Sequence, residues 1–177
     1  MVKFKNLKSK PYIIAEIGIN HNGYYEIAKK LILQSKKAGA DAVKFQKRDV
    51  EDLVNYNTSP GFSKGYLSKN EYDTKKKNTK FGSWVYPDTR LELSKKDYIK
   101  IKKLTKKIGI DLIITPWDEK SVIFIKKLGV KFLKIASIDA NNFHFCDYVA
   151  RQKLPTIIST GMCTYNEILK TQKIFKK

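Results

Sequence analysis

Short apolar runs alternate along the chain with longer segments whose apolar residues recur at helical spacing. The runs are 12–18, 42–46, 111–115, 132–136 and 156–159. Each run is nearly continuous in apolar residues until its C-terminal end, a pattern typical of parallel strands that are covered on both faces. The pattern therefore predicts five strands, each followed by a helical segment.

Capping residues and glycines bound the predicted helices. In the first helix, Ile27, Leu31 and Ala38 fall on one side. Polar residues suited to helix starts are Ser94 with Asp97, Asp118, and Thr164 with Glu167. Glycines suited to helix ends are Gly39, Gly109 and Gly129. The fourth helix, around 144–152, has weaker signals.

Five consecutive βα units indicate an α/β fold built on a parallel sheet. The hydrophobic periodicity fits either a barrel or a doubly wound sheet, so both stay open at this point. A complete (β/α) barrel typically has about 250 residues, whereas this chain has 177. A barrel of this length would therefore be partial.

The segment 47–89 interrupts the alternation because it is long, polar and scattered with aromatic residues. Long loops in compact domains are usually functional or disordered. This one follows the C-terminal end of a predicted strand, which is the catalytic side of such folds. We interpret it as a loop that covers the substrate, with a surface loop pinned by its aromatic residues as the alternative.

Composition places the chain among globular proteins, with 42% hydrophobic and 30% charged residues. No apolar run approaches the roughly 20 residues of a membrane span. The apolar stretch near the N-terminus contains Glu16, which excludes a signal-peptide core, so we expect a cytoplasmic protein. Cys146 and Cys163 lack zinc or C-x-x-C spacing, and we expect both to be reduced.

The formal net charge of +19 raises the question of nucleic-acid binding. The positive charges are almost all lysines in positions typical of solvated helix surfaces: Lys29, Lys30, Lys36, Lys37, Lys102, Lys103, Lys106, Lys107, Lys126 and Lys127. No RNA-binding motif, zinc finger or arginine-rich arm accompanies them. We therefore expect no nucleic-acid partner and no membrane partner, but a positive field that attracts small anions.

Polar residues stand where the apolar strands end. Lys44 and Lys134 lie inside apolar runs, and an isolated buried charge is costly, so each needs a partner. One alternative is a lysine paired with a core carboxylate such as Glu16. Hydroxyls also stand at the ends of three runs: Thr115, Ser137 and Ser159. Two lysines together with these hydroxyls favour a shared anion.

The chemistry of these groups favours a small ligand with a phosphate and a carboxylate. Lysine ammonium groups act as point charges toward each anion, and hydroxyls add hydrogen-bond donors. Gly161 lets the backbone approach closely at the end of the fifth strand. The chain has no P-loop and no G-x-G-x-x-G motif, so a nucleotide is not the favoured anion.

Five motifs resemble the sialic acid synthase family, which includes N-acetylneuraminate, legionaminate and pseudaminate synthases. They are A-E-I-G-I-N-H-N-G (15–23), A-V-K-F-Q (42–46), I-T-P-W-D-E-K (114–120), K-I-A-S (134–137) and I-S-T-G-M (158–162). They follow the family's order and spacing over nearly the whole chain. The resemblance implies the N-terminal part of a TIM-type (β/α) barrel over residues 1–177, about five βα units of eight. Related phosphoenolpyruvate aldolases that make seven-carbon or eight-carbon sugar acids are the runner-up.

The family condenses phosphoenolpyruvate with an N-acetylmannosamine-type sugar to a nine-carbon sialic acid and releases phosphate. Matched residue by residue, the resemblance assigns phosphoenolpyruvate binding to Lys44, Thr115, Lys134, Ser137 and Ser159. It makes Glu16 the acid/base or water-orienting carboxylate. Further candidates near the ligand are Asn20, His21 and Gln46. For His21 we favour a loop or pocket hydrogen-bonding role over metal ligation, and we expect His144 at the surface.

The family uses a divalent metal, Mn or Mg, whose two histidine ligands lie on strands beyond Lys177, so we expect no metal ligands in this chain. The last three barrel strands and the antifreeze-like domain of the family are also absent. We therefore expect a fragment, a split gene product or a truncated relative, with little activity alone. A homo-oligomer or a complementary chain would complete the barrel. The alternative function is a non-catalytic, anion-binding partial barrel, and the sugar substrate stays open.

Overall fold

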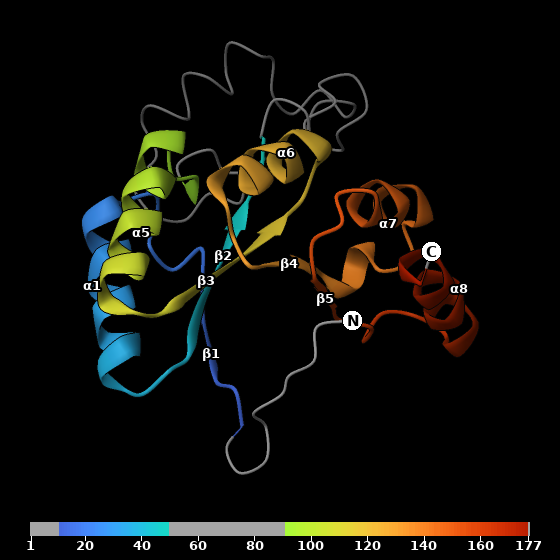
Figure 1. Ribbon diagram of the computed structural model, residues 1–177, viewed down its shortest axis with the longest axis horizontal. Helices are drawn as coiled ribbons and strands as arrows, with labels where there is room; N and C mark the ends of the chain where they lie inside the picture. Colours follow the sequence, from blue (N-terminus) through green and yellow to red (C-terminus); the bar gives the residue numbers. More distant parts are fainter. Residues whose placement is uncertain (1–10, 50–90, 177) are drawn as a thin grey trace, which may run out of the picture.

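The computed structural model describes residues 11–49 and 91–176, which form one parallel sheet with helices (Figure 1). The strands are β1 Ile14–Gly18, β2 Ala42–Lys47, β3 Asp111–Pro116, β4 Phe132–Ile135 and β5 Thr156–Ile158. The helices are α1 Tyr25–Lys37, α5 Lys95–Ile108, α6 Glu119–Leu128, α7 Phe143–Ala150 and α8 Tyr165–Phe175, with a short 3-10 helix, η2, at Ser137–Asp139. All five predicted strands and their helices are therefore confirmed.

The strand order decides between the two α/β architectures that periodicity left open. The strands lie in the order β1-β2-β3-β4-β5, and every neighbouring pair is parallel. A doubly wound sheet reverses its strand order at a switch point, and these five strands do not. The described residues therefore form five βα units of a partial TIM-type (β/α) barrel.

The strand register assigns side chains to the two faces of the sheet. Lys44 on β2 lies opposite Glu16 on β1 and Ile113 on β3, and Ile113 lies opposite Phe132 on β4. Register partners in a parallel sheet point to the same side, and alternate residues share a face. Lys44 and Lys134 therefore point to the same side of the sheet, which is the side away from the helices.

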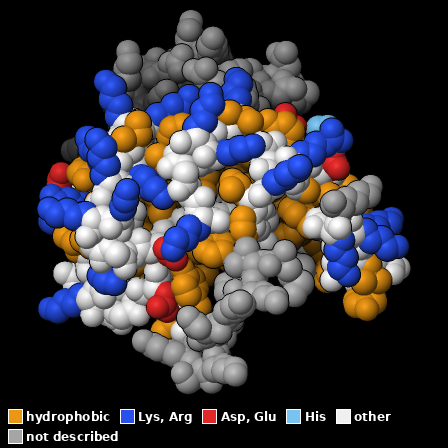
Figure 2. All heavy atoms as spheres, in the orientation of Figure 1, with side chains coloured by type: hydrophobic (Ala, Val, Ile, Leu, Met, Phe, Trp, Pro, Cys, Tyr) orange, Lys and Arg blue, Asp and Glu red, His pale blue; other side chains and the backbone are white. Residues whose placement is uncertain are grey.

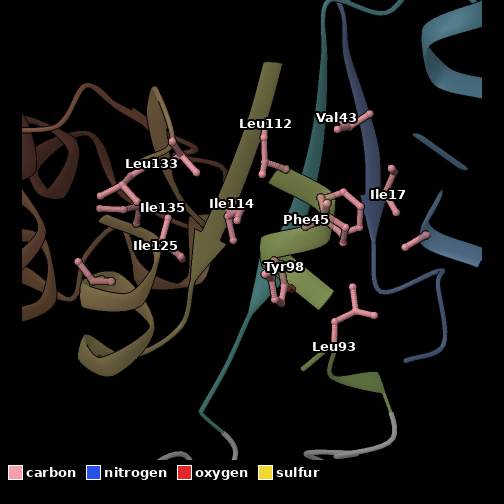
Figure 3. Close-up of a cluster of buried hydrophobic side chains, with 14 of the residues drawn as sticks. Ile17, Val43, Phe45, Leu93, Tyr98, Leu112, Ile114, Ile125, Leu133 and Ile135 are labelled. Atoms are coloured by element: carbon pink, nitrogen blue, oxygen red, sulfur yellow. The ribbon is translucent and has the colours of Figure 1, made fainter. Parts of the chain in front are cut away.

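The hydrophobic core lies between the other face of the sheet and the helices. Strand residues in it are Ile17, Val43, Phe45, Leu112, Ile114, Leu133 and Ile135. Tyr98 of α5 packs edge-on against Phe45, with ring centroids 6.3 Å apart, and Ile125 of α6 is fully buried. Figure 3 shows these side chains gathered between the strands and the helices. Apolar residues thus fill the helix side, whereas the opposite face carries polar residues such as Lys44 and Lys134 beside apolar ones such as Ile113.

The predicted helix caps are confirmed by hydrogen bonds. The Ser94 hydroxyl accepts from Asp97 N, and the Asp118 carboxylate accepts from Ser121 N at 2.6 Å. Thr164 and Glu167 form a complete capping box at the start of α8. Gly109 and Gly129 end α5 and α6 with φ values of +68° and +73°, a conformation that glycine adopts at no steric cost.

Two sequence predictions need correction. In α1 the buried residues are Ala28 and Ile32, whereas Ile27 and Ala38 are exposed. The helix thus buries a stripe one position further along than the predicted one.

Lys47 belongs to β2 rather than to the following loop. The rest of that predicted loop, 50–89, lies outside the described residues.

The basic surface matches the expected solvated helix faces. Figure 2 shows Lys and Arg side chains over much of the described part of the visible face, with few acidic ones. The ten lysines expected at helix surfaces are exposed except Lys29 and Lys102, which are half-buried.

Cys146 and Cys163 are both free thiols, and His144 is exposed. No helix among the described residues is both long and apolar enough to span a membrane.

Candidate anion-binding site

Polar side chains gather on the sheet face that points away from the helices. They are Glu16, Lys44, Gln46, Thr115, Lys134 and Ser159, and we call this group the lysine face. Its members come from all five βα units of the described chain. The carboxyl ends of parallel strands are where ligands bind in this class of fold.

Lys44 and Glu16 form an ion pair on the lysine face. They are register partners on β1 and β2, and the Lys44 Nζ contacts Glu16 Oε2. The Lys44 side chain is 16% exposed, whereas that of Glu16 is 50% exposed. The alternative of a lysine paired with a core carboxylate thus applies to Lys44. The pair thus joins a largely buried ammonium group to a carboxylate that solvent still reaches.

Lys134 has a different environment. Its Nζ donates a hydrogen bond to Ile135 O, and it forms no ion pair with any described carboxylate. Burial lowers the pKa of Lys134, the charge of Lys44 lowers it further, and Glu16 opposes the shift. The two ammonium groups are therefore close enough to repel each other. An anion between them would relieve this repulsion.

Thr115 supplies a buried hydroxyl beside these lysines. It lies opposite Gln46 in the β2–β3 register and is 2% exposed. Its Oγ1 has no hydrogen-bond partner within the described part of the chain. Buried polar groups are normally satisfied, so this hydroxyl on the same face as the two lysines is suited to donate to an anionic oxygen.

Gly18 brings Glu16 and Gln46 together at the end of β1. The β1–β2 register shifts between Glu16 and Gly18, and Gly18 has a φ of +54°. A Cβ atom at this position would lie 3.2 Å from Glu16 Oε1 and 3.6 Å from Gln46 Nε2. The absence of a side chain thus allows the carboxylate and the amide to approach the same point from two strands.

The predicted serines follow β4 and β5. Ser159 comes directly after β5, and its N donates to Ile135 O, which continues the parallel ladder beside Lys134. By alternation from Ile157, the Ser159 side chain shares the face of Lys134. Ser137 begins η2 and is half-buried, so it stands at the carboxyl edge but outside the strand ladder.

Two further candidates lie apart from the lysine face. The Asn20 amide donates to Ile17 O at 2.9 Å and so closes its own turn. His21 is buried and stacks on Phe45, which points toward the helices. Its Nδ1 accepts from Gly23 N, and burial lowers its pKa. The structure therefore does not bring these two side chains together with Lys44 and Lys134.

A buried charge cluster, which the sequence reading missed, lies at the end of β2. Glu92 contacts Arg48 Nε at 2.5 Å and Lys47 Nζ at 3.3 Å. Asp49 N donates to Asp118, the cap of α6. Two consecutive cations directly after an apolar strand were the available signal. The cluster joins the end of β2 to the segments that precede α5 and α6.

Metal ligands are not gathered among the described residues, where no three His, Cys, Asp or Glu side chains lie together. Glu16, the carboxylate of the lysine face, is already paired with Lys44. The described residues therefore offer no donor set to which a divalent cation could be assigned. The expectation that metal ligands lie beyond Lys177 stays a prediction.

Several curated proteins resemble this chain over most of its length. An N,N'-diacetyllegionaminic acid synthase of Legionella pneumophila is 41% identical over 158 residues, 89% of this chain and 41% of that protein. An N-acetylneuraminate-9-phosphate synthase of Drosophila melanogaster is 39% identical over 89% of this chain and 39% of its own length. A pseudaminic acid synthase of Campylobacter jejuni is 34% identical over 97% of this chain. The chain thus spans less than half of these relatives.

Solved structures agree with this pattern. The N-acetylneuraminic acid synthetase of Leptospira borgpetersenii, in complex with citrate, matches with a TM-score of 0.74 and 28% identity over 95% of this chain and 50% of its own. A truncated 3-deoxy-D-arabino-heptulosonate 7-phosphate synthase of Thermotoga maritima matches with a TM-score of 0.58 and 12% identity, over 93% of this chain and 46% of its own, which shows the shared fold alone. The model of the NeuB family matches residues 31–177. The chain belongs to the NeuB family, the family of the sialic acid synthases.

Proposed function

We propose that this chain provides the phosphoenolpyruvate-binding part of a sialic acid synthase, which condenses phosphoenolpyruvate with an N-acetylmannosamine-type sugar. The supporting observation is that Lys44 and Lys134 share one face at the carboxyl edge of the sheet, while Lys134 has no carboxylate of its own within the described residues. Phosphoenolpyruvate carries a phosphate and a carboxylate, so it can engage both ammonium groups.

The neutral and acidic groups of the lysine face complete this proposal. The unsatisfied hydroxyl of Thr115 would donate to a phosphate oxygen, with Ser137 and Ser159 as further donors from the next two strand ends. Gln46 lies opposite Thr115 in the register and next to Glu16. That a relative in the family was solved in complex with citrate, another small polyanion, is in keeping with this assignment.

The reaction forms one carbon–carbon bond and one carbon–oxygen bond, the latter to water, and breaks the carbon–oxygen bond to phosphate. The enol methylene carbon attacks the aldehyde carbon of the open-chain sugar, and the aldehyde oxygen gains a proton. Water adds to the former enol carbon, phosphate leaves with the electrons of its C–O bond, and a 2-keto acid remains. Glu16 is the proposed acceptor of a proton from that water, and the half-exposure of its carboxylate beside Lys44 supports this role.

A divalent metal, Mn or Mg, would supply Lewis-acid polarisation of the sugar aldehyde when bound. Its ligands are proposed to lie on strands that follow this chain. Within the described residues β1 pairs with β2 alone and β5 with β4 alone, so both strands have an edge at which further strands can add. A complementary chain or a second copy is the proposed partner at these edges.

Two assays on one preparation test the proposal. Phosphoenolpyruvate is titrated calorimetrically, with inorganic phosphate and pyruvate as single-anion controls, and pyruvyl transfer is measured with manganese and N-acetylmannosamine. We expect phosphoenolpyruvate to bind more tightly than either fragment because it engages both cations. Binding without turnover would support the non-catalytic, anion-binding alternative for the isolated chain. Equal affinities for phosphate, pyruvate and phosphoenolpyruvate would contradict the proposed site.

A further inference from the structure

Lys134 combines two properties that bear on its reactivity. Its amine is half-buried and hydrogen-bonded to Ile135 O, and it has no ion-pair partner among the described carboxylates. It also shares a face with a second cation, Lys44, which the carboxylate of Glu16 holds in place. The first property affects how readily the amine reacts, and the second affects which reagents, in particular anions, bind beside it.

The electrostatic surroundings increase the share of Lys134 in its neutral form. Burial and the charge of Lys44 both lower its pKa, and the opposing effect of Glu16 is the smallest of the three. Only the neutral amine is a nucleophile, so a lysine with a lowered pKa reacts faster with electrophiles at neutral pH. Lys44, in contrast, contacts the carboxylate of Glu16.

The geometry also supplies a guide for an anionic reagent. Lys44 on β2 and Lys134 on β4 are separated by β3 and offset by two residues along the strands, so their backbones lie about 12 Å apart at the usual strand spacing and rise. Side chains of this length can reach a small anion between them from both sides. The buried hydroxyl of Thr115, on β3 between the two, has no partner within the described residues. A phosphate held there would place its substituent next to Lys134.

We propose that Lys134 is an acylation site for small acyl phosphates, of which acetyl phosphate is the simplest. The proposal rests on the anion site of the proposed function. The neutral amine attacks the acyl carbon, and a C–N bond forms. The bond between the acyl carbon and the bridging oxygen of the phosphate breaks, and inorganic phosphate leaves with the electron pair of that bond. The proton of the amine passes to the released phosphate or to water, and no oxidant or reductant is needed.

The modification has a consequence for the site. An amide is neutral, so acylation removes one of the two cations of the lysine face and adds a group where the ligand would lie. Acylated chains should therefore lose phosphoenolpyruvate binding. Phosphoenolpyruvate binding would therefore decrease as the concentration of acyl phosphates rises, because the same groups of the lysine face bind the ligand and the reagent.

Lys102 provides a control within the same molecule. Burial also lowers its pKa, and its Nζ donates to Gly129 O at 2.6 Å. It lies on α5, however, on the helix side of the sheet, away from Lys44 and Thr115. If lowered pKa alone decided reactivity, both lysines would acylate readily. If a bound phosphate guides the reagent, Lys134 should be preferred only when the reagent is an anion.

The test compares two acetylating reagents on the intact chain, with initial rates at each lysine measured by peptide mass spectrometry. One reagent is acetyl phosphate, and the other is an uncharged acetyl ester. We expect the ratio of Lys134 to Lys102 labelling to be about tenfold higher with acetyl phosphate, because binding raises the local concentration of the acyl group. Inorganic phosphate should suppress the labelling of Lys134 but not that of Lys102. The same ratio with both reagents would overturn the proposal.

Two variants separate guidance from folding. Lys44→Arg keeps the second cation and should retain preferential labelling of Lys134, whereas Lys44→Gln should lose it. Loss of the preference in both variants would overturn the role of the second charge. A phosphoenolpyruvate titration on the same sample keeps the two proposals distinguishable: binding without preferential labelling sinks the acylation site alone, whereas the absence of binding sinks the proposed function as well.

Discussion

Glu16 and Lys44 face each other across neighbouring strands, and their side chains form an ion pair on the face of the sheet that the helices do not cover. This pair makes the two lysines of the site unequal. Lys44 has a carboxylate beside it, whereas Lys134 has none within ion-pair distance among the described residues. The positive charge that Lys44 can offer to a ligand therefore depends on whether Glu16 is paired with it.

Replacement of Glu16 by Gln should separate binding from chemistry. The variant removes a negative charge next to the proposed anion, so phosphoenolpyruvate should bind up to about tenfold more tightly, the equivalent of one weakened charge repulsion. In a preparation with synthase activity, turnover should be lost. Calorimetry and phosphate release measure the two effects. Glu26→Gln on the exposed surface of α1 is the matched control, and weaker binding by Glu16→Gln would contradict the assignment.

Phosphoenolpyruvate affinity should depend on the protonation of Lys134. Its pKa is lowered below 10.5 by burial and by Lys44, so its ammonium loses the proton earlier than an ordinary lysine does. Affinity should therefore fall as pH rises through this lowered pKa. Binding measured across the alkaline range checks this, and Lys134→Arg, which stays charged, should remove this fall. A pH profile that is the same for both proteins would contradict it.

Lys134 should also leave a signature in stability. Its folded-state pKa is lower than its pKa in the unfolded chain, so between the two values the unfolded state binds more protons. The free energy of unfolding should rise with pH in that window, and Lys134→Met should flatten the rise. Urea denaturation at several alkaline pH values, with Lys103→Met on the exposed face of α5 as the control, measures the difference.

Glu92 should be more important for stability than an exposed acidic residue. Its carboxylate contacts both Lys47 and Arg48, which are nearly buried. Removal of one partner from a buried ion pair typically costs about 3–5 kcal/mol. We expect a loss of this size for Glu92→Gln. Asp97→Asn, which breaks the more exposed pair with Lys100, should cost at most about 1 kcal/mol.

The caps of α5 and α6 should differ in their contribution to stability. Asp118 accepts hydrogen bonds from Ser121 N, Ser121 Oγ and Asp49 N and is buried. Ser94 makes an exposed cap. Asp118→Ala should lower the free energy of unfolding by about 2–3 kcal/mol and Ser94→Ala by about 1 kcal/mol. Equal losses in urea denaturation would show that the additional bonds of Asp118 are not stabilising.

The sequence predicted the strands and caps because their signals are local. An apolar run that ends in a polar residue, or a Thr164 three positions before a Glu167, depends on a few neighbouring residues alone. The stripe of α1 was misjudged because its apolar residues extend around more than one side of the helix. Packing against the sheet then selects Ala28 and Ile32, which periodicity alone does not determine.

The lysine face was predictable in composition but not in geometry. Lysines inside apolar runs indicated a shared anion, and the register places Lys44 and Lys134 on one face. The sequence could not show that Glu16 pairs with Lys44, because these residues of β1 and β2 become neighbours only in the folded sheet. Glu92 was missed because it lies 44 residues from Arg48 along the chain. His21 was placed near the ligand by its motif, whereas the structure packs it against Phe45.

The most direct test is a phosphoenolpyruvate titration of the unmodified chain, of Lys134→Gln and of Lys103→Gln, each checked for folding by circular dichroism. The two variants lose the same charge, but Lys103 is exposed on α5 and Lys134 lies on the lysine face. We expect Lys134→Gln to weaken binding at least about tenfold, since it removes one of the two charges proposed to contact the ligand, and Lys103→Gln to leave it nearly unchanged. Equal weakening by both variants would mean that the general positive field, and not the paired lysines, attracts the ligand.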